Sequence, residues 1–146
     1  MINIKIERLI DCLEELAPIL AGHWDEVEHD KDEVPLKPDF VTYLKLEEAG
    51  HIMLVVARAD DKIIGYQWDV VHTNLHYSEL YAVNDLMYLN KEYRGSGVFN
   101  AMSDVAEEYL ISLGVKVRTI TFKVESDKMS HGYKLVEHVH HKNLGV

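Results

Sequence analysis

Apolar and polar positions follow two different spacing patterns along this chain, and each pattern predicts a type of secondary-structure element. Residues 98–113 carry apolar side chains at intervals of three and four, with polar and acidic side chains opposite, which predicts an amphipathic helix that Gly114 ends. The run 83–89 before it is apolar at nearly every position, as is typical of a buried central strand. Asp85 is the one charged residue in that run.

The first third of the chain combines the same two spacing patterns. Residues 2–6 alternate and predict a first strand, and helical spacing follows over 6–24, where Pro18 is expected to kink or end the helix. The acidic segment 25–39 contains two prolines and predicts a loop. A second helix is expected over 39–50, capped by an aspartate at its start and closed by a glycine.

The remaining apolar runs predict strands. Two β-rich runs, 52–59 and 62–72, are joined by a short polar connection that is typical of a hairpin. A further strand is expected over 115–124, beyond the predicted helix. No repeat, low-complexity tract or linker-like change in composition divides the chain, so residues 1–146 are expected to form a single α/β domain.

Composition narrows the classes of function. A formal net charge of −10 argues against a nucleic-acid groove, which needs a basic stripe, and is more compatible with a cationic or amine-bearing acceptor. Cys12 is the only cysteine, so no intrachain disulfide can form and the chain fits a reducing cytoplasm. No apolar run is long enough for a membrane span and the N-terminus lacks a signal-peptide pattern, so we expect a cytoplasmic protein with no membrane partner.

The turn between the strand at 83–89 and the helix at 98–113 carries the candidate chemistry. Its sequence, Arg94-Gly95-Ser96-Gly97, combines a cation and a hydroxyl with two glycines, which let the backbone approach a ligand closely. Free N–H groups and the positive end of a helix dipole meet at this point, which suits a phosphate-bearing ligand. An ordinary tight turn with a solvated arginine is the alternative.

The segment YLNKEYRGSGVF, residues 88–99, resembles motif A of the GNAT N-acetyltransferase superfamily. That motif is Arg or Gln, two residues, Gly, one residue, then Gly or Ala, directly after the fourth strand. It maps onto Arg94, Gly97 and Phe99, and Phe99 departs from the family pattern. The resemblance implies an α+β fold with a mixed, mostly antiparallel sheet of about six to seven strands and about four helices. Residues 134–144 resemble the last strands of that fold.

The same resemblance implies a co-substrate, acetyl-CoA, and an activity, direct transfer of an acetyl group to a primary amine of a small molecule or peptide. The fourth and fifth strands of the family splay apart, and pantetheine enters between them, so the backbones of Met87 and Leu89 are expected to contact it. Many members form homodimers, which is a further expectation. The residues expected to bind the pyrophosphate are Arg94, Gly95, Ser96, Gly97, Val98 and Phe99.

The reaction needs a group that accepts the amine proton. A buried carboxylate binds a proton more readily than an exposed one, which makes Asp85 the first candidate, with Glu79 and His76 as rivals. The alternative for Asp85 is a buried aspartate satisfied by backbone donors.

The leaving thiolate also needs a proton. Family members carry a tyrosine four residues before a Gly-aromatic pair, but here Lys128 stands four before Gly132. Tyr133, Ser130 or water are therefore the candidate acids. Phe99 and the missing tyrosine motivate an alternative function, a catalytically inactive GNAT-like protein that binds CoA or a protein partner through an acidic surface.

In the family, two helices after the first strand and the loop before the fourth strand line the acceptor site. The resemblance therefore implies acceptor contacts for His23, Trp24, Glu26 and His76. From the residues alone, a core position for Trp24 and a surface position for His23 and Glu26 are the alternatives. His138 and His140 share a strand face, but two ligands make a poor site, so no metal is predicted.

Overall fold

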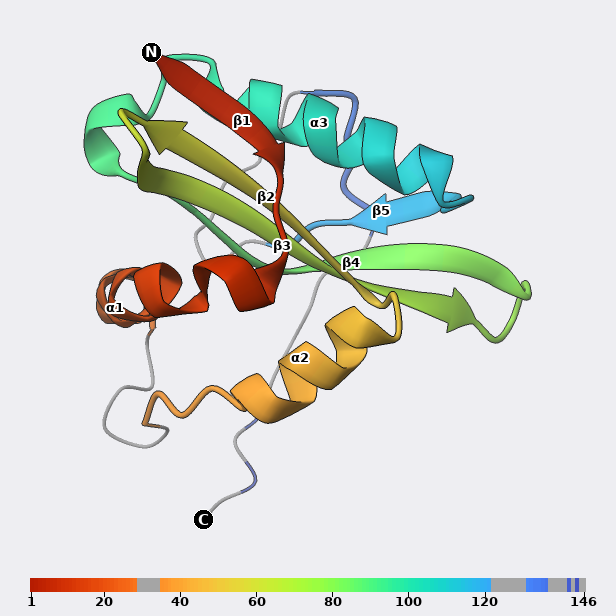
Figure 1. Cartoon of the computed structure of the whole chain (residues 1–146). Coiled ribbons are helices and arrows are strands. Elements are labelled where there is room, and N and C mark those ends of the chain that lie inside the picture. The colour runs from red at the N-terminus through yellow and green to blue at the C-terminus, as the bar shows by residue number, and fades with distance from the viewer. Residues whose placement is uncertain (29–34, 122–130, 137–141, 143, 145–146) are drawn as a thin grey trace.

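The computed structural model describes residues 1–28, 35–121, 131–136, 142 and 144 (Figure 1). Within these residues no helix is long and apolar enough to cross a membrane. The elements in chain order are β1 (Ile2–Ile6), α1 (Leu9–Val27), α2 (Phe40–Glu48), β2 (Ile52–Ala59), β3 (Lys62–Asn74), β4 (Glu79–Leu89), the 3₁₀ turn η1 (Lys91–Tyr93), α3 (Val98–Ser112) and β5 (Val117–Thr119).

The sheet has the strand order β1-β2-β3-β4-β5. The first three pairings are antiparallel, and β5 runs parallel to β4. This confirms the predicted mixed, mostly antiparallel α+β fold. The predicted number of six to seven strands and four helices differs from the five strands and three α-helices of the described residues. Residues 122–124 of the predicted fifth strand lie outside the described residues, as does most of 134–144.

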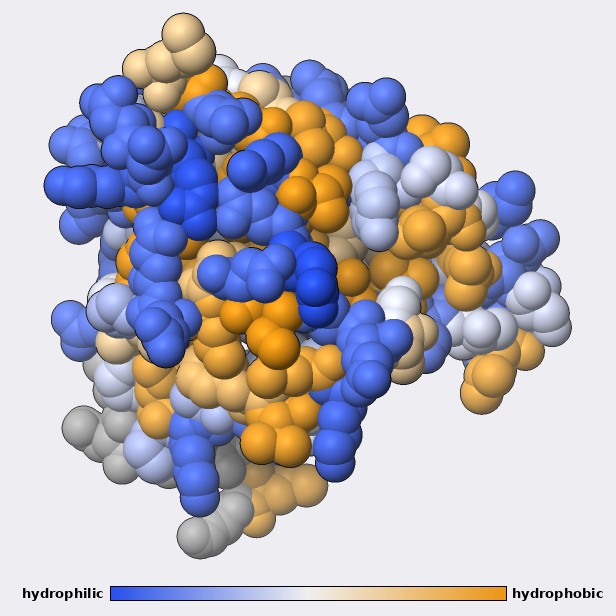
Figure 2. All heavy atoms as spheres, viewed as in Figure 1, coloured by the Kyte–Doolittle hydropathy of each residue, from blue (hydrophilic) through white to orange (hydrophobic). Residues whose placement is uncertain are grey.

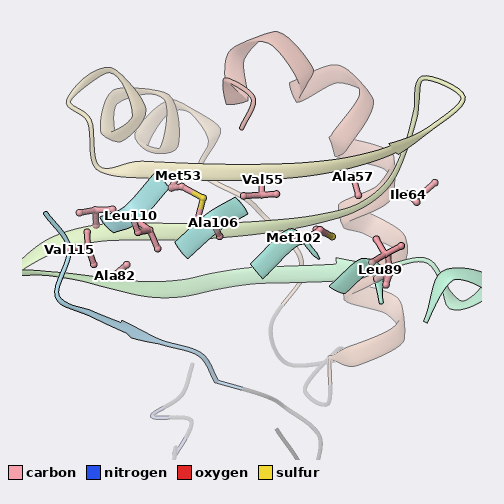
Figure 3. Packing of buried hydrophobic residues seen from close by; sticks show 12 residues of the cluster. Met53, Val55, Ala57, Ile64, Ala82, Leu89, Met102, Ala106, Leu110 and Val115 are labelled. Atoms are coloured by element: carbon pink, nitrogen blue, oxygen red, sulfur yellow. The ribbon is translucent and has the colours of Figure 1, made fainter. Parts of the chain in front are cut away.

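Helices cover both faces of the sheet (Figure 1). On one face α3 packs against β2, and the apolar stripe predicted from its spacing is the side that is buried. Figure 3 shows this core from close by. It includes Met53 and Val55 of β2 and Met102, Ala106 and Leu110 of α3.

The other face is covered by α1 and α2. Here Leu9, Leu16 and Leu20 of α1 bury against Tyr66 and Trp68 of β3, both of which are fully buried. The helix continues through Pro18 to Val27, so of the two expectations for Pro18, a kink or an end of the helix, the second is wrong. Burial of apolar residues on both sides of the proline offsets the one backbone hydrogen bond that proline cannot make.

Local signals at the ends of the elements are confirmed. Asp39 accepts a hydrogen bond from the backbone N–H of Thr42 at 3.0 Å and so caps α2. Gly114, with φ +88°, follows the end of α3. The β2–β3 hairpin turns at Asp60 and Asp61, both of which have positive φ, as a two-residue hairpin turn requires.

Gly65 lets β3 and β4 approach each other closely. A Cβ there would lie 2.8 Å from both the Leu89 Cδ1 and the Tyr88 carbonyl oxygen. We therefore expect Gly65→Ala to lower the free energy of unfolding by about 1–3 kcal/mol, measured by urea denaturation.

Gly22→Ala is the matched control, because a Cβ at Gly22 meets nothing within 4 Å and Gly22 lies inside α1. Alanine favours a helix interior, so this variant should be as stable as the parent or more so. Equal stability of Gly65→Ala and the parent would contradict the close approach.

Arg58 of β2 connects the sheet to the start of α1. Its Nε and Nη2 donate to the two carboxylate oxygens of Glu7 at 2.8 and 3.0 Å, and its Nη1 donates to Glu15 at 2.9 Å. The hydrogen bond from Arg58 lowers the pKa of Glu7 below its ordinary value of 4.5, against the opposing effect of burial. The Glu7 side chain is only 12% exposed, so solvent screens this pair little.

We expect Glu7→Gln to cost about 1.5–3 kcal/mol of stability at pH 7. A lowered folded-state pKa means that the stabilisation is fully present above the unfolded pKa. The difference between parent and variant should therefore shrink as the pH falls from about 4.5 through the lower folded-state pKa. Urea denaturation at several pH values measures this, with the exposed Glu14→Gln as control; a difference independent of pH would contradict it.

Candidate functional site

The start of α3 is an open group of backbone donors. Gly97 is the N-cap residue, with φ +87°, and no side chain caps the helix. In the described part of the chain, no hydrogen bond engages the N–H groups of Val98, Phe99 or Asn100. These donors point along the positive end of the helix dipole, an arrangement that binds anions.

Gly95 and Gly97 both adopt left-handed backbone conformations, at φ +76° and +87°. A Cβ at either position would meet nothing within 4 Å. The two glycines are therefore needed for the shape of the turn and for open access to its amides, and they are not needed for packing.

Arg94 connects this turn to the end of α1. Its Nε donates to the Leu89 carbonyl at 2.8 Å, its Nη1 donates to Glu26 at 2.7 Å, and its guanidinium lies 5.6 Å from the centre of the Tyr88 ring. The hydrogen bond from Arg94 lowers the pKa of Glu26. Glu26, which the resemblance assigns to the acceptor, thus serves as the ion-pair partner of the turn in this structure.

Phe99 belongs to the α3-side core. Its side chain is partly buried and packs against the cluster that contains Leu89, Val98 and Met102. Its carbonyl accepts a hydrogen bond from Gln67 Nε2 at 3.3 Å. The departure from the family motif is therefore accommodated by packing of the ring on the core.

The resemblance predicts that the fourth and fifth strands splay apart, and within the described residues they pair over only a short stretch. β5 pairs with β4 only through Tyr81–Val83, and in the described residues the rest of β4 has no strand partner on that side. A cavity of about 510 Å³ lies beside this unpaired part of β4, which we call the β4–β5 gap. Its wall comes from α1, α2, the segment that joins these two helices, β3, β4 and the residue Thr121 shortly after β5.

A β-bulge in β4 places Asp85 at this cavity. Trp68 of β3 pairs with Leu86 and Asp69 pairs with Asn84, so Asp85 is the extra residue. It is exposed, and its carboxylate accepts a hydrogen bond from the Tyr43 hydroxyl of α2 at 2.5 Å. The predicted burial at this position is wrong because the bulge turns Asp85 out of the regular alternation, although the residue does line the cavity.

Three other predicted residues, His23, Trp24 and Met87, line the same cavity. His23 is buried, against the surface alternative, and its Nδ1 lies 2.6 Å from the Tyr66 hydroxyl. Leu89 is 7% exposed and belongs to the α3-side core.

The structure does not bring Glu79 and His76 to this cavity. Glu79 is the first residue of β4, and His76 lies in the turn before it. Asp85 lies six positions after Glu79 along the extended strand, a distance of about 20 Å. Both residues therefore lie at the opposite end of β4 from the start of α3.

Tyr133 lies outside the residues that line the cavity and forms part of a buried polar network. Its hydroxyl donates to Glu107 at 2.7 Å and accepts from Arg118 at 3.2 Å. Burial, together with the bond to Glu107, raises its pKa above the ordinary range. The other candidate positions for the acid, Lys128 and Ser130, lie outside the described residues.

Sequence reasoning did not identify Tyr43, Trp68, Asn84 or Thr121 as part of a site. Their side chains are ordinary for a helix and for strands, and only the fold brings them to one cavity. Among the described residues no group of three or more His, Cys, Asp or Glu side chains could hold a metal ion. The predicted pair His138 and His140 lies outside them.

No family model matches the sequence, and comparison with curated proteins gives no match. Solved structures do match. A GNAT family acetyltransferase from Staphylococcus aureus subsp. aureus has 16% identity and a TM-score of 0.69, over 98% of this chain and 98% of that chain. The aminoglycoside acetyltransferase HMB0005 from an uncultured soil metagenomic sample has 14% identity and a TM-score of 0.71, over 100% and 99% of the two chains.

A third structure, AAC(6')-Iy in complex with the bisubstrate analog CoA-S-monomethyl-acetylneamine, has 16% identity and a TM-score of 0.60, over 84% of this chain and 80% of that chain. These matches extend over most or all of each chain at low sequence identity, so they establish likeness of fold. Together with the parallel β4–β5 pairing that ends at Val83, they show that this chain has the fold of the GNAT acetyltransferases.

Proposed function

We propose that this protein is an N-acetyltransferase that moves an acetyl group from acetyl-CoA directly to a primary amine. The observation that carries the proposal is that three features lie along the second half of β4 and the segment after it: the open amides of α3, the β4–β5 gap, and the cavity beside that gap. A diphosphate, a pantetheine arm and an acceptor would occupy these in turn. Relatives of the fold whose names include acetyltransferase support the reaction class.

Different residues would bind the co-substrate and accept the proton. The N–H groups of Val98, Phe99 and Asn100 would bind the diphosphate oxygens, with Gly95 and Gly97 keeping access open. The amine nitrogen attacks the thioester carbonyl carbon, the new N–C bond forms as the C–S bond breaks, and the thiolate leaves with the electron pair. Asp85 lines the cavity and would accept the proton that the amine loses.

Release of free thiol from acetyl-CoA, followed over a panel of primary amines, tests this proposal. Turnover that depends on both the enzyme and an amine supports it, and mass spectrometry of the product should show the amine heavier by one acetyl group. CoA binding without turnover of any amine would favour the alternative, a catalytically inactive binding protein. That alternative draws support from Tyr133, which hydrogen-bonds Glu107 and does not line the cavity.

A further inference from the structure

The wall of the cavity beside the β4–β5 gap is chiefly apolar and aromatic. Figure 2 shows apolar side chains gathered between α1 and α2, with hydrophilic side chains around them. The aromatic and leucine side chains that line the cavity include Leu20, Trp24, Phe40, Tyr43, Trp68 and Leu86. Within it, the Tyr43 and Trp68 rings lie 4.5 Å apart at an interplanar angle of 59°.

Few ionisable side chains share this wall. Besides His23 and Tyr43, the described lining contains the carboxylates Asp85 and Glu28 and the ammonium of Lys37. Lys37 balances one of the two carboxylates, so the wall offers a net attraction for about one cation. A polycationic acceptor would need several carboxylates and many polar partners, which the described residues of this lining do not supply.

Asp85 is the carboxylate next to the gap through which the acetyl group would arrive. The bulge presents it from β4, and the Tyr43 hydroxyl fixes its Oδ2 oxygen, which leaves the second carboxylate oxygen available to a ligand. Aromatic faces also attract ammonium groups and pack well against flat rings. A ligand with an ammonium group at Asp85 and an apolar body beside it therefore matches both the carboxylate and the aromatic side chains of the wall.

We propose that the acceptor is a primary monoamine with an aromatic or bulky apolar body, such as an arylalkylamine, whose ammonium group binds Asp85 while its body packs against Trp24, Phe40 and Trp68. This rests on the proposed acetyl transfer. The ammonium loses one proton and becomes an amine, and its nitrogen bonds the acetyl carbon as the C–S bond breaks. The nitrogen then loses a second proton, which the leaving thiolate takes up. The products are an amide, free CoA thiol and one proton released to solvent.

Turnover and binding of matched amines test the acceptor class with the full chain. The probes are 2-phenylethylamine, 2-phenylethanol, which lacks the ammonium, and spermidine, which has charge without an aromatic body. We expect kcat/KM for 2-phenylethylamine to exceed that for spermidine by about 10-fold or more. Higher kcat/KM for spermidine would overturn the acceptor class while leaving the acetyltransferase proposal intact.

Calorimetric titration without any thioester separates the two proposals further. 2-Phenylethylamine should bind at least about 10-fold more tightly than either 2-phenylethanol or spermidine. Absence of this preference overturns the acceptor class whatever the turnover assay shows. Binding with this preference but no turnover would support the acceptor class and would count only against the proposed acetyl transfer.

Two variants test whether residues of the cavity wall cause the preference for 2-phenylethylamine. Asp85→Asn should weaken 2-phenylethylamine binding about 10- to 100-fold and leave 2-phenylethanol unchanged, with Asp11→Asn on the exposed side of α1 as control. Phe40→Ala should raise KM for 2-phenylethylamine several-fold but not for spermidine, with Val41→Ala, whose side chain is exposed, as control. Equal effects of a variant and its control would overturn the assignment.

Discussion

Replacement of Gly97 by valine is expected to weaken CoA binding by about 100-fold or more. Gly97 adopts φ +87°, a conformation that a β-branched residue adopts only under strain. The new side chain would also stand in the open space before the amides of Val98 and Phe99, where we place the diphosphate. Calorimetric titration with CoA measures the loss, and a thermal melt checks that the variant is folded.

Gly114→Val is a closely matched control. Gly114 has φ +88°, a Cβ there also meets nothing within 4 Å, and the residue lies at the other end of the same helix. The two variants should therefore lose similar stability, but Gly114→Val should bind CoA as the parent does. If folded Gly97→Val kept the parental Kd, the start of α3 would not be the binding site.

Replacement of Arg118 by leucine should have the largest effect on stability. Its Nε and Nη2 donate to both carboxylate oxygens of Asp69, at 2.6 and 2.9 Å, and the two side chains are 6% and 0% exposed. Burial opposes the charge of Arg118, but its bonds to Asp69 more than offset this and raise its pKa. Loss of the arginine leaves a buried carboxylate unpaired, which costs about 3–5 kcal/mol. Urea denaturation measures this.

The double variant Asp69→Asn, Arg118→Met separates the pair from its surroundings. It removes both charges, so it should recover part of the stability lost in Arg118→Leu. Asp69 also accepts from Asn84 at 2.7 Å, beside the bulge that presents Asp85. A cost below about 1 kcal/mol for Arg118→Leu would show that the pair does not hold this part of the sheet.

Signals within a few residues of each other predicted the elements well. The three- and four-residue spacing gave α3, Asp39 gave the cap of α2, and the polar pair before Lys62 gave the β2–β3 turn. The motif from Arg94 to Phe99 located the open helix start for the same reason, since its geometry depends on glycines at fixed positions between a strand and a helix.

Contacts between distant residues could not be predicted in this way. Tyr43 meets Asp85 across 42 positions of sequence, and Glu26 meets Arg94 across 68. A one-residue bulge in β4 decides that Asp85 faces the cavity, and a shift of one residue changes the face of every side chain beyond it. The nearly continuous apolar run over 83–89 carries no sign of that extra residue.

The sequence by itself therefore determined the order of elements, a domain that combines helices and strands, and the glycine turn at the start of α3, because each depends on short-range periodicity and backbone preference. Only the tertiary structure decided which side chains share the cavity and which acidic residue lies beside the β4–β5 gap. Strand register and helix packing set those distances, and both are properties of the whole folded chain.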